Sequence, residues 1–322
     1  MNKWCLLVAA LVLMPNLAYG SIGFRTIVDA SEATRPLMLS IWYPSDGDQF
    51  DIIGGNAVFQ GESAALDAPV VGKHPLVVLS HGGLRSTKDS GAWLGAALAK
   101  AGFIVIEVNA PRPENPAMAV DEIWQRPRDI SRALSVILDN AAWADHIDEK
   151  KVAVIGFALG GTAALSLAGA ELDAERYYES CADAGSIGAD CTWFSSHNVA
   201  LNQVDQDEFE QSRHDRRFTS AVLIAPEYLE AFSIESGMAL APTLLISLGS
   251  QEMKTLRLPH VEKKAIDEAN RLDAFAVCTE SGPQILLEEE GDAALCGTSP
   301  EERVRIHALI ADMIVSFLAR SF

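Results

Sequence analysis

Residues Lys151-Val-Ala-Val-Ile-Gly-Phe-Ala-Leu-Gly-Gly-Thr-Ala-Ala-Leu-Ser-Leu-Ala-Gly169 decide the fold of this chain. The apolar, β-branched run from Val152 to Ile155 predicts a buried strand. Gly156-Phe-Ala-Leu-Gly160 predicts a sharp turn, because glycine adopts tight backbone conformations without steric cost. Residues 162–170 are all small or apolar, which is typical of a helix packed closely on a sheet. The stretch therefore predicts a strand, a tight turn and a helix in direct succession.

The composition favours a folded domain with a sizeable core. The chain has 322 residues, of which 49% are hydrophobic and 21% are charged, and this argues against disorder. A chain of this length often forms one large α/β domain. The formal net charge is −19. This charge disfavours nucleic acid or an anionic membrane as a partner, because both are bound through basic patches.

The first 20 residues are typical of a secretory signal peptide. Lys3 supplies the positive start, residues 4–14 form the apolar centre, and Ala18-Tyr-Gly20 provides small residues before a cleavage point at Ser21. The apolar run is too short to cross a bilayer, and no later stretch has about 18 apolar residues. We therefore expect an exported protein without a transmembrane segment, with residues 21–322 forming a single domain.

Removal of the signal peptide would leave four cysteines. An exported chain with four cysteines is expected to form two disulfides, for which three connectivities exist. Proximity in sequence favours the pairs Cys181–Cys191 and Cys278–Cys296. The cysteines do not have the spacing of metal ligands. We expect neither a metal nor a cofactor.

Hydrophobic patterns predict strands that alternate with helices along most of the chain. Such alternation predicts a doubly wound, mostly parallel sheet with helices on both faces. Residues 48–72 are expected to form a loop. Residues 171–217, which include Cys181 and Cys191, are predicted to be an insertion over the carboxyl edge of the sheet, where substrates enter. The expected strands are residues 23–28, 37–43, 76–79, 103–108, 152–155, 220–225, 243–248 and 284–287, and the expected helices are residues 91–101, 124–138, 162–170, 259–273 and a C-terminal helix around 306–317.

A glycine loop, Ser80-His81-Gly82-Gly83, directly follows the strand expected at residues 76–79. The loop resembles the HGG-type loop of α/β-hydrolases, in which a backbone N–H donates a hydrogen bond to the oxygen of a bound carbonyl group. The resemblance implies that Gly82 and Gly83, together with the N–H group of Leu159, bind an acyl or carboxylate oxygen. His81 is expected to orient this loop.

Several stretches of this sequence resemble the dienelactone-hydrolase-like and platelet-activating-factor-acetylhydrolase-like branch of the α/β-hydrolases. The nucleophile elbow of these enzymes, G-x-S-x-G, corresponds to Gly156–Gly160 of this sequence. The resemblance implies the α/β-hydrolase fold, and members of the branch are serine-type hydrolases of esters and lactones, many of them exported. The matching pieces, which extend over nearly the whole mature chain, are Gly23-Phe-Arg-Thr26, Ile41-Trp-Tyr-Pro44, residues 74–82, Trp124-Gln-Arg-Pro-Arg-Asp129, residues 154–161 and the helix with Ile306-His307.

The resemblance also assigns the positions of a Ser-Asp-His catalytic triad, and these are degenerate. Ala158 stands at the nucleophile position, and its methyl group cannot attack a carbonyl. The acid position is Ala225 in one arrangement of the branch and Glu252 in the other. Asp292 takes the place of the histidine, in the segment after the strand expected at residues 284–287. Losses at two or more triad positions favour a natural non-catalytic member.

The leading hypothesis is therefore a non-catalytic exported protein that binds a small ester or acyl ligand or a protein partner. The alternative is an active carboxylic ester or lactone hydrolase with a displaced triad, which requires a serine or cysteine within about 3 Å of a histidine at the pocket floor. A third interpretation is a structural subunit of a larger complex. The serines and histidines considered for a displaced triad, all more typical of structural or solvated residues, are Ser80, Ser86, Ser90, His81, His197, His214 and His260.

Two clusters of charge are not expected to bind an anion or a metal ion. Arg126, Arg128 and Asp129 are predicted to form ion pairs rather than an anion-binding site. The carboxylates between residues 288 and 292 are typical of a solvated surface turn rather than a metal site.

Overall fold

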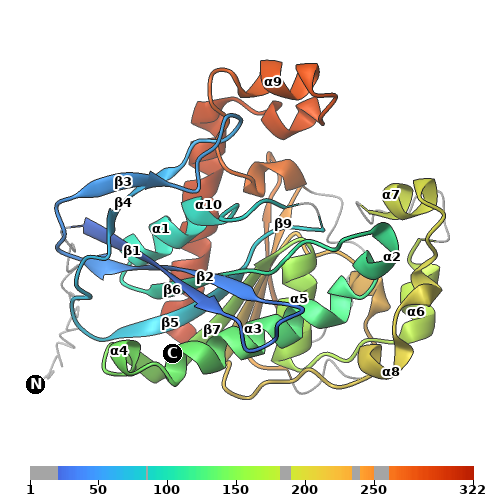
Figure 1. Ribbon diagram of the computed structural model, residues 1–322, viewed down its shortest axis with the longest axis horizontal. Helices are drawn as coiled ribbons and strands as arrows, with labels where there is room; N and C mark the ends of the chain where they lie inside the picture. The colour runs from blue at the N-terminus through green and yellow to red at the C-terminus, as the bar shows by residue number, and fades with distance from the viewer. Residues whose placement is uncertain (1–20, 85, 182–189, 234–239, 250–260) are drawn as a thin grey trace, which may run out of the picture.

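The computed structural model describes residues 21–84, 86–181, 190–233, 240–249 and 261–322. The predicted signal peptide at residues 1–20, the predicted acid Glu252 and His260 lie outside the described residues. Within the described ranges, ten strands join in one mixed sheet with helices on both faces (Figure 1). This is the doubly wound arrangement expected from the alternation of strands and helices.

The elements follow one another from an N-terminal hairpin to a long C-terminal helix. The strands are β1 (Ser21–Asp29), β2 (Leu37–Ser45), β3 (Phe50–Ile53), β4 (Glu62–Leu66), β5 (His74–Ser80), β6 (Ile104–Asn109), β7 (Ile147–Phe157), β8 (Ser220–Ile224), β9 (Thr243–Leu248) and β10 (Val261–Ile266). The helices are α1 (Ala92–Lys100), α2 (Pro116–Ala119), α3 (Glu122–Leu138), α4 (Ala141–Ala144), α5 (Leu159–Ala168), α6 (Ala174–Glu179), α7 (Cys191–Ser196), α8 (Gln206–Phe209), α9 (Gly282–Glu288) and α10 (Pro300–Ser321). Short 3-10 helices are η1 (Leu201–Gln203), η2 (Leu229–Ala231), η5 (Arg271–Ala274) and η6 (Ala293–Cys296).

The parallel strands are neighbours in the sheet. The order is β10-β9-β8-β7-β5-β6-β2-β1-β4-β3. Strands β5 to β10 run parallel, whereas β2 pairs antiparallel with both β6 and β1. The carboxyl ends of the parallel strands therefore lie together, which is where open α/β sheets bind ligands.

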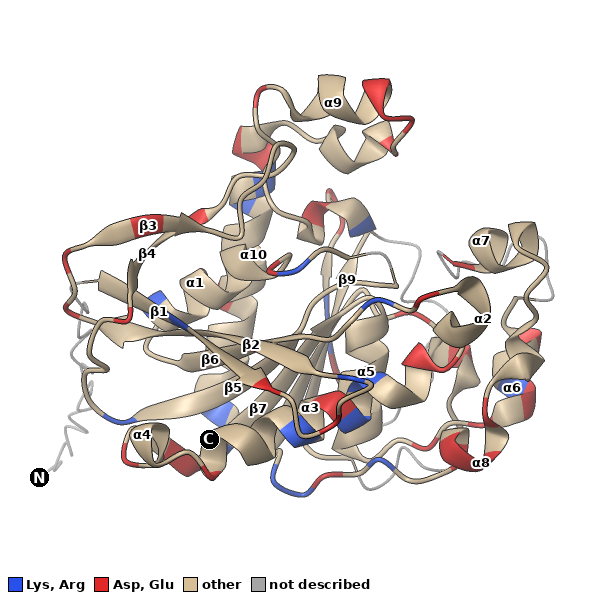
Figure 2. Cartoon of the chain, viewed as in Figure 1, with Lys and Arg blue, Asp and Glu red and all other residues tan. Residues whose placement is uncertain are grey.

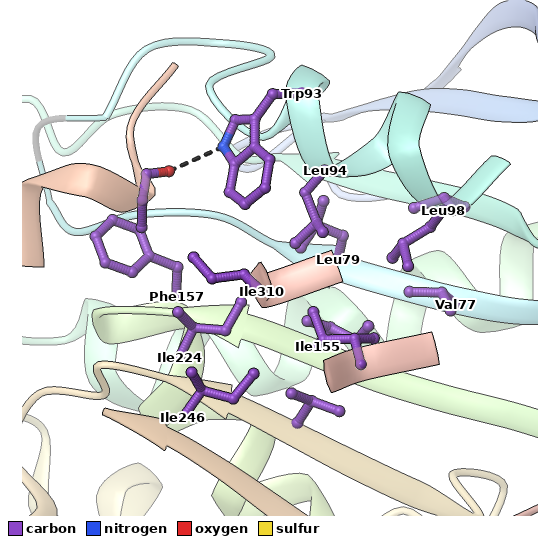
Figure 3. Close-up of a cluster of buried hydrophobic side chains, with 14 of the residues drawn as sticks. Val77, Leu79, Trp93, Leu94, Leu98, Ile155, Phe157, Ile224, Ile246 and Ile310 are labelled. Atoms are coloured by element: carbon purple, nitrogen blue, oxygen red, sulfur yellow. Dashed lines mark hydrogen bonds between the residues drawn. The ribbon is translucent and has the colours of Figure 1, made fainter. Parts of the chain in front are cut away.

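The central strands contain buried apolar runs, such as residues 76–79 of β5 and 152–155 of β7, because helices cover both faces of the sheet. In β5, Leu76 and Val78 pack in the core layer that also contains side chains of α3 and α5. Val77 and Leu79 point the opposite way, into the layer formed with α1 and α10. Figure 3 shows this second layer, with Trp93 reaching toward the carboxyl end of the sheet.

Both disulfides predicted from sequence proximity are confirmed, as Cys181–Cys191 and Cys278–Cys296. The first lies within residues 171–217, whose short helices α6, α7 and α8 lie beside α2 and α3 (Figure 1). Aromatic side chains of this segment, such as Tyr177, share a hydrophobic cluster with residues of α3. Acidic residues lie on α6 and α8 (Figure 2), and Glu175, Glu179 and Asp207 among them are exposed.

Two secondary-structure predictions near the C-terminus are wrong. Residues 261–266, expected in a helix, form the edge strand β10. Its sequence Val-Glu-Lys-Lys-Ala-Ile carries charges because an edge strand is partly exposed, and a short mixed pattern does not distinguish a helix from a strand. Residues 284–287, expected as the last strand, lie in α9, which has Pro283 in its first turn. Strand β10 is thus the last strand of the sheet.

A third correction concerns residues 48–72, which were expected to form a loop. They contain β3 and β4, which pair antiparallel with each other at the end of the sheet beyond β1. β3 is exposed and β4 buries only two small residues, Ala64 and Ala65, so their hydrophobic periodicity and the strand signal are weak.

Candidate ligand-binding site

The turn between β7 and α5 keeps the backbone of a nucleophile elbow. Ala158 has φ 54° and ψ −123°, a conformation that costs a non-glycine residue roughly 1–3 kcal/mol. Gly156 and Gly160, on either side of Ala158, must be glycines because other backbone atoms approach them closely. A Cβ on Gly156 would overlap the carbonyl oxygen of Gly160, and a Cβ on Gly160 would overlap that of Ser80. The elbow is therefore intact, and a methyl group stands at its tip.

A cavity of about 590 Å³ lies above Ala158. This volume is in the range of pockets that enclose small organic ligands, roughly 300–1,000 Å³. Its described walls come from the glycine loop, residues between β3 and β4, the elbow, Asp190 ahead of α7, η5 and the segment closed by the second disulfide. The larger apolar lining residues are Phe59, Leu84, Phe157, Leu272, Phe275, Leu286 and Leu295, and the charged ones are Asp190, Glu227, Arg271 and Asp292.

The glycine loop is tied directly to the elbow. The Gly82 N–H donates to the Phe157 carbonyl at 3.2 Å, and the Gly160 N–H donates to the Gly82 carbonyl at 3.4 Å. Arg126 donates to the carbonyl oxygens of Gly82 and Gly83 at 2.9 and 2.8 Å. The Gly82 N–H, expected to face a ligand, is thus engaged inside the protein.

Two other backbone donors remain available at this turn. Within the part of the chain that the structure describes, the N–H groups of Gly83 and Leu159 donate no hydrogen bond. Gly83 lines the cavity, whereas Leu159, the first residue of α5, is buried and is not among the described lining residues. The first N–H groups of a helix have no partner within the helix and attract negatively charged or carbonyl oxygens.

Glu227 places a buried carboxyl group beside the elbow. Its backbone N–H donates to the Ala158 carbonyl at 3.3 Å, and its carbonyl accepts a hydrogen bond from the Thr162 hydroxyl. One carboxylate oxygen, Oε1, accepts from Nη2 of Arg271 at 2.6 Å. The other, Oε2, is buried and has no hydrogen-bond partner. Burial, followed by the negative charge of Asp190, raises the pKa of Glu227 to about 7, although Arg271 opposes this.

The structure brings some of the predicted triad positions together at the cavity. Ala158 and Asp292 both line it, and Asp292 also caps η6 by accepting from the Ala294 N–H. Ala225 is buried and is not among the lining residues; its N–H donates to the carbonyl of Ile246 in β9. Residues 284–287 belong to α9, so the prediction that Asp292 comes directly after a last strand at those residues is wrong.

Sequence reasoning missed Glu227 and Arg271. Glu227 comes two residues after Ala225, at the carboxyl end of β8, and this position next to a buried strand was an available signal. Arg271 follows β10 by five residues and therefore lies in the segment where the fold places its catalytic histidine. The error in assigning β10 concealed it.

His81 is held in the protein interior, consistent with the expectation that it orients the glycine loop. Its Nε2–H donates to the Ala274 carbonyl at 2.9 Å, and the Ser90 hydroxyl lies 3.1 Å from Nδ1. The same Ala274 carbonyl accepts from the Trp93 indole (Figure 3). Burial lowers the pKa of His81 to about 4, so the ring is neutral at physiological pH. No histidine is found among the described residues that line the cavity, whereas Ser86 and Ser90 are.

The charge cluster at the start of α3 forms ion pairs, as predicted. Arg126 pairs with Glu122 at 3.3 Å, Arg128 with Glu32 at 2.9 Å, and Asp129 with Arg35 at 2.8 Å. Across the described residues, no group of three or more histidine, cysteine or carboxylate side chains is arranged to hold a metal ion.

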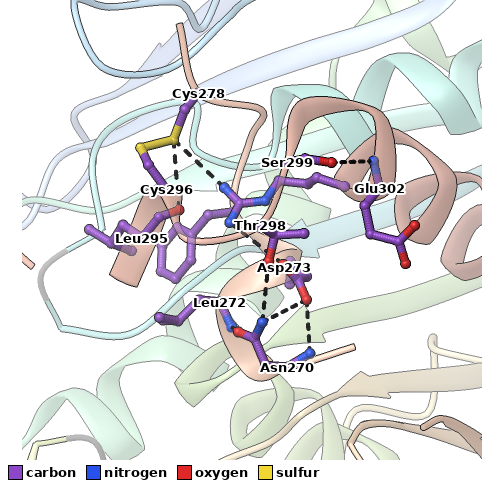
Figure 4. A network of polar contacts seen from close by, with 12 residues as sticks. Asn270, Leu272, Asp273, Cys278, Leu295, Cys296, Thr298, Ser299 and Glu302 are labelled. Atoms are coloured by element: carbon purple, nitrogen blue, oxygen red, sulfur yellow. Dashed lines mark hydrogen bonds and ion pairs between the residues drawn. A yellow bond between two sulfur atoms is a disulfide. The ribbon is translucent and has the colours of Figure 1, made fainter. Parts of the chain in front are cut away.

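A buried polar network anchors the wall that carries Arg271 (Figure 4). Asp273 Oδ2 accepts from the backbone and side-chain nitrogens of Asn270, each at 2.8 Å. Its other oxygen faces Arg303 of α10 at 3.6 Å, and both side chains are 1% exposed. Arg303 also contacts the Cys278–Cys296 disulfide at Cys278 Sγ. The chain after β10 is therefore fixed to α10 and to the disulfide-closed segment.

Comparison with known proteins gives short sequence matches and a long structural match. No protein-family model matches the chain. Over 88 residues, or 27% of this chain, it is 34% identical to cutinase est2 of Thermobifida alba and 33% identical to cutinase 2 of Thermobifida cellulosilytica. The match spans 27% and 31% of those two proteins, less than a third of their length.

The structural match extends over nearly the whole chain. A ferulic acid esterase from Streptomyces cinnamoneus aligns with a TM-score of 0.56 and 16% identity, covering 94% of this chain and 91% of that one. This chain has the α/β-hydrolase fold. Among the described residues, no helix has the length and apolar character to cross a bilayer. The two disulfides suit an oxidising, extracellular environment.

Proposed function

We propose that this protein is an exported, non-catalytic relative of the dienelactone-hydrolase-like ester hydrolases that binds a small ester or acyl ligand in the cavity above Ala158. The observation that carries the proposal is the elbow itself. Its strained backbone and its glycines are those of a hydrolase, yet the residue at the tip has no nucleophile.

The residue after the last strand supports the same proposal. Arg271 occupies the segment in which a hydrolase of this fold carries its histidine. A guanidinium group stays protonated and has no acceptor atom, so it cannot take a proton from a nucleophile. It forms an ion pair with Glu227 instead. The cavity therefore has a carboxylate and a cation where an enzyme would have an acid and a base.

The available N–H groups of Gly83 and Leu159 support binding of a carbonyl oxygen. Such donors stabilise an acyl oxygen even where no nucleophile is present, as the residual activity of triad-deleted hydrolases shows. The apolar walls, which include Phe157 and Phe275, suit the hydrocarbon part of such a ligand.

Hydrolysis of p-nitrophenyl acetate and butyrate by the protein lacking residues 1–20 tests the catalytic half of the proposal. We expect no turnover above that of heat-denatured protein, together with saturable quenching of tryptophan fluorescence by a non-hydrolysable ketone analogue. Turnover accompanied by covalent labelling with a serine-directed fluorophosphonate would refute the non-catalytic proposal. Export is tested by N-terminal sequencing of the secreted or periplasmic protein, which we expect to begin at Ser21.

One observation favours an active hydrolase as a second candidate. Ser90 lines the cavity, and its hydroxyl lies 3.1 Å from Nδ1 of His81, whose opposite nitrogen is oriented by the Ala274 carbonyl. This is the serine–histidine contact that a displaced triad requires. The low pKa of His81 makes it a weak base at neutral pH. If wild-type turnover is found and Ser90→Ala abolishes it, this second candidate is the correct function.

A further inference from the structure

The charged groups of the cavity favour a positively charged ligand group. Three of the described lining residues are acids, Asp190, Glu227 and Asp292, and one is a base, Arg271. The base is already engaged, since its Nη2 lies 2.6 Å from Oε1 of Glu227. A ligand that brought a further negative charge would face this excess of carboxylates.

Glu227, which lines the cavity, has one carboxylate oxygen that needs a hydrogen-bond donor. Oε2 of Glu227 is buried without a hydrogen-bond partner, in a side chain that is 4% exposed. It lies close to the cavity floor, because a Cβ built on Gly83 would be 3.6 Å from it. A buried carboxylate oxygen without a donor is unfavourable, and a ligand N–H placed there would remove that cost.

We propose that the ligand carries an ammonium group that donates to Oε2 of Glu227, adjacent to the acyl or ester oxygen bound by the backbone. The inference rests on the proposed function, because it names the chemical class of the ligand of that same cavity. An ammonium group is favoured over a hydroxyl group because its positive charge is also attracted to the carboxylates that line the cavity. The rings of Phe157 and Phe275, which meet edge to face at 5.4 Å, provide an aromatic wall for the apolar body of the ligand.

The proposal predicts a pH dependence for ammonium binding. The charged groups that face Glu227 are Arg271 on η5, Asp190 ahead of α7 and Arg126 on α3. With the pKa of Glu227 at about 7, the carboxylate fraction rises about tenfold between pH 6 and pH 8. An alkylamine stays protonated over this range. Its affinity should therefore rise about tenfold, whereas that of a neutral alcohol should not change.

Isothermal titration calorimetry with three ligands of one shape tests the proposal. The ligands are 3-phenylpropylamine, 3-phenylpropanol and 3-phenylpropionate. At pH 8 we expect the amine to bind at least tenfold more tightly than the alcohol, since a hydrogen bond to a buried charge is among the stronger ones, and the carboxylate to bind most weakly. Glu227→Gln should remove the preference for the amine and its pH dependence. Glu230→Gln removes a carboxylate from the exposed surface three residues away and should leave both unchanged.

Each other outcome overturns the inference in a recognisable way. Equal binding of amine and alcohol, or a preference that survives Glu227→Gln, refutes it and leaves the ligand cavity of the proposed function standing. Tightest binding of 3-phenylpropionate refutes it in favour of recognition through the backbone N–H groups alone. If none of the three binds, the inference and the ligand-binding proposal fall together. If Glu227→Gln does not fold, a flat pH dependence for the amine in the wild-type protein still refutes it.

Discussion

Replacing Glu107 with glutamine should stabilise the protein at alkaline pH and leave it unchanged at acid pH. Glu107 lies on β6, is 1% exposed and stands behind the glycine loop. Its Oε1 accepts from the Gly91 N–H at 2.7 Å, and its Oε2 has no hydrogen-bond partner. Burial, with Asp89 as the second cause, raises the pKa of Glu107 from 4.5 to about 8. Glutamine keeps the acceptor for Gly91 and carries no charge at any pH.

The size of the expected change in stability follows from the difference between the pKa values of Glu107 in the unfolded and the folded protein. The unfolded chain releases the Glu107 proton near pH 4.5, whereas the folded protein keeps it until about pH 8. Between these values the folded state binds more protons, so the free energy of unfolding falls as the pH rises. Each pKa unit corresponds to about 1.4 kcal/mol, which gives a loss of roughly 5 kcal/mol by pH 9. The Glu107→Gln variant should not suffer this loss.

Urea unfolding of both proteins at pH 5, 7 and 9, with disulfides intact, measures the effect. The free energies of unfolding should agree within about 1 kcal/mol at pH 5, and the variant should be more stable by several kcal/mol at pH 9. Glu149→Gln, at an exposed position on β7, is the matched control and should show no such pH-dependent gain. A difference between wild type and Glu107→Gln that stays constant from pH 5 to pH 9 would refute the reasoning.

Further variants test the elbow, the cavity and its anchoring network. Ala158→Ser alone should remain inactive, whereas Ala158→Ser/Arg271→His should hydrolyse p-nitrophenyl butyrate roughly 10²-fold faster than the single variant; equal rates would show that residue 271 is not the base position. Ala158→Gly should keep or raise the stability to urea by about 1 kcal/mol because it relieves a positive φ, whereas Ala163→Gly inside α5 should lower it by at least about 1 kcal/mol. Asp273→Ala should cost roughly 3–5 kcal/mol in urea unfolding because it leaves Arg303 buried without its carboxylate, and a cost below about 1 kcal/mol would contradict that ion pair.

The parts of the fold that sequence could predict are those with one dominant physical signal. The strand, turn and helix around Ala158 were predictable because the spacing of Gly156 and Gly160 permits one close packing of helix on strand. The disulfides were predictable from proximity in the chain. Strand β10 was not, because six residues at a sheet edge, with two lysines and a glutamate, carry no apolar run.

Some residues of the candidate site could also be predicted from the sequence, and others could not. Ala158 could be placed at the elbow tip from its own neighbours in sequence. Glu227 and Arg271 meet across 44 positions in the chain, and their contact depends on how β8 and β10 end relative to one another. No local pattern specifies such a contact. Asp292 was predicted at the cavity and lies there, although it reaches it from a 3-10 helix rather than from the end of a strand.

The Cys278–Cys296 disulfide closes a segment that forms part of the cavity wall. The segment that it closes supplies Leu286, Asp292 and Leu295 to the cavity wall, yet most of that segment is exposed and buries few apolar side chains. Hydrophobic burial alone would hold it weakly. A newly made chain in a reducing compartment would therefore possess a folded sheet and elbow but an unfinished pocket. The pocket would be completed only when the two thiols are oxidised. The redox state of the compartment, rather than the presence of ligand, would then determine whether the protein is in its immature or its mature form.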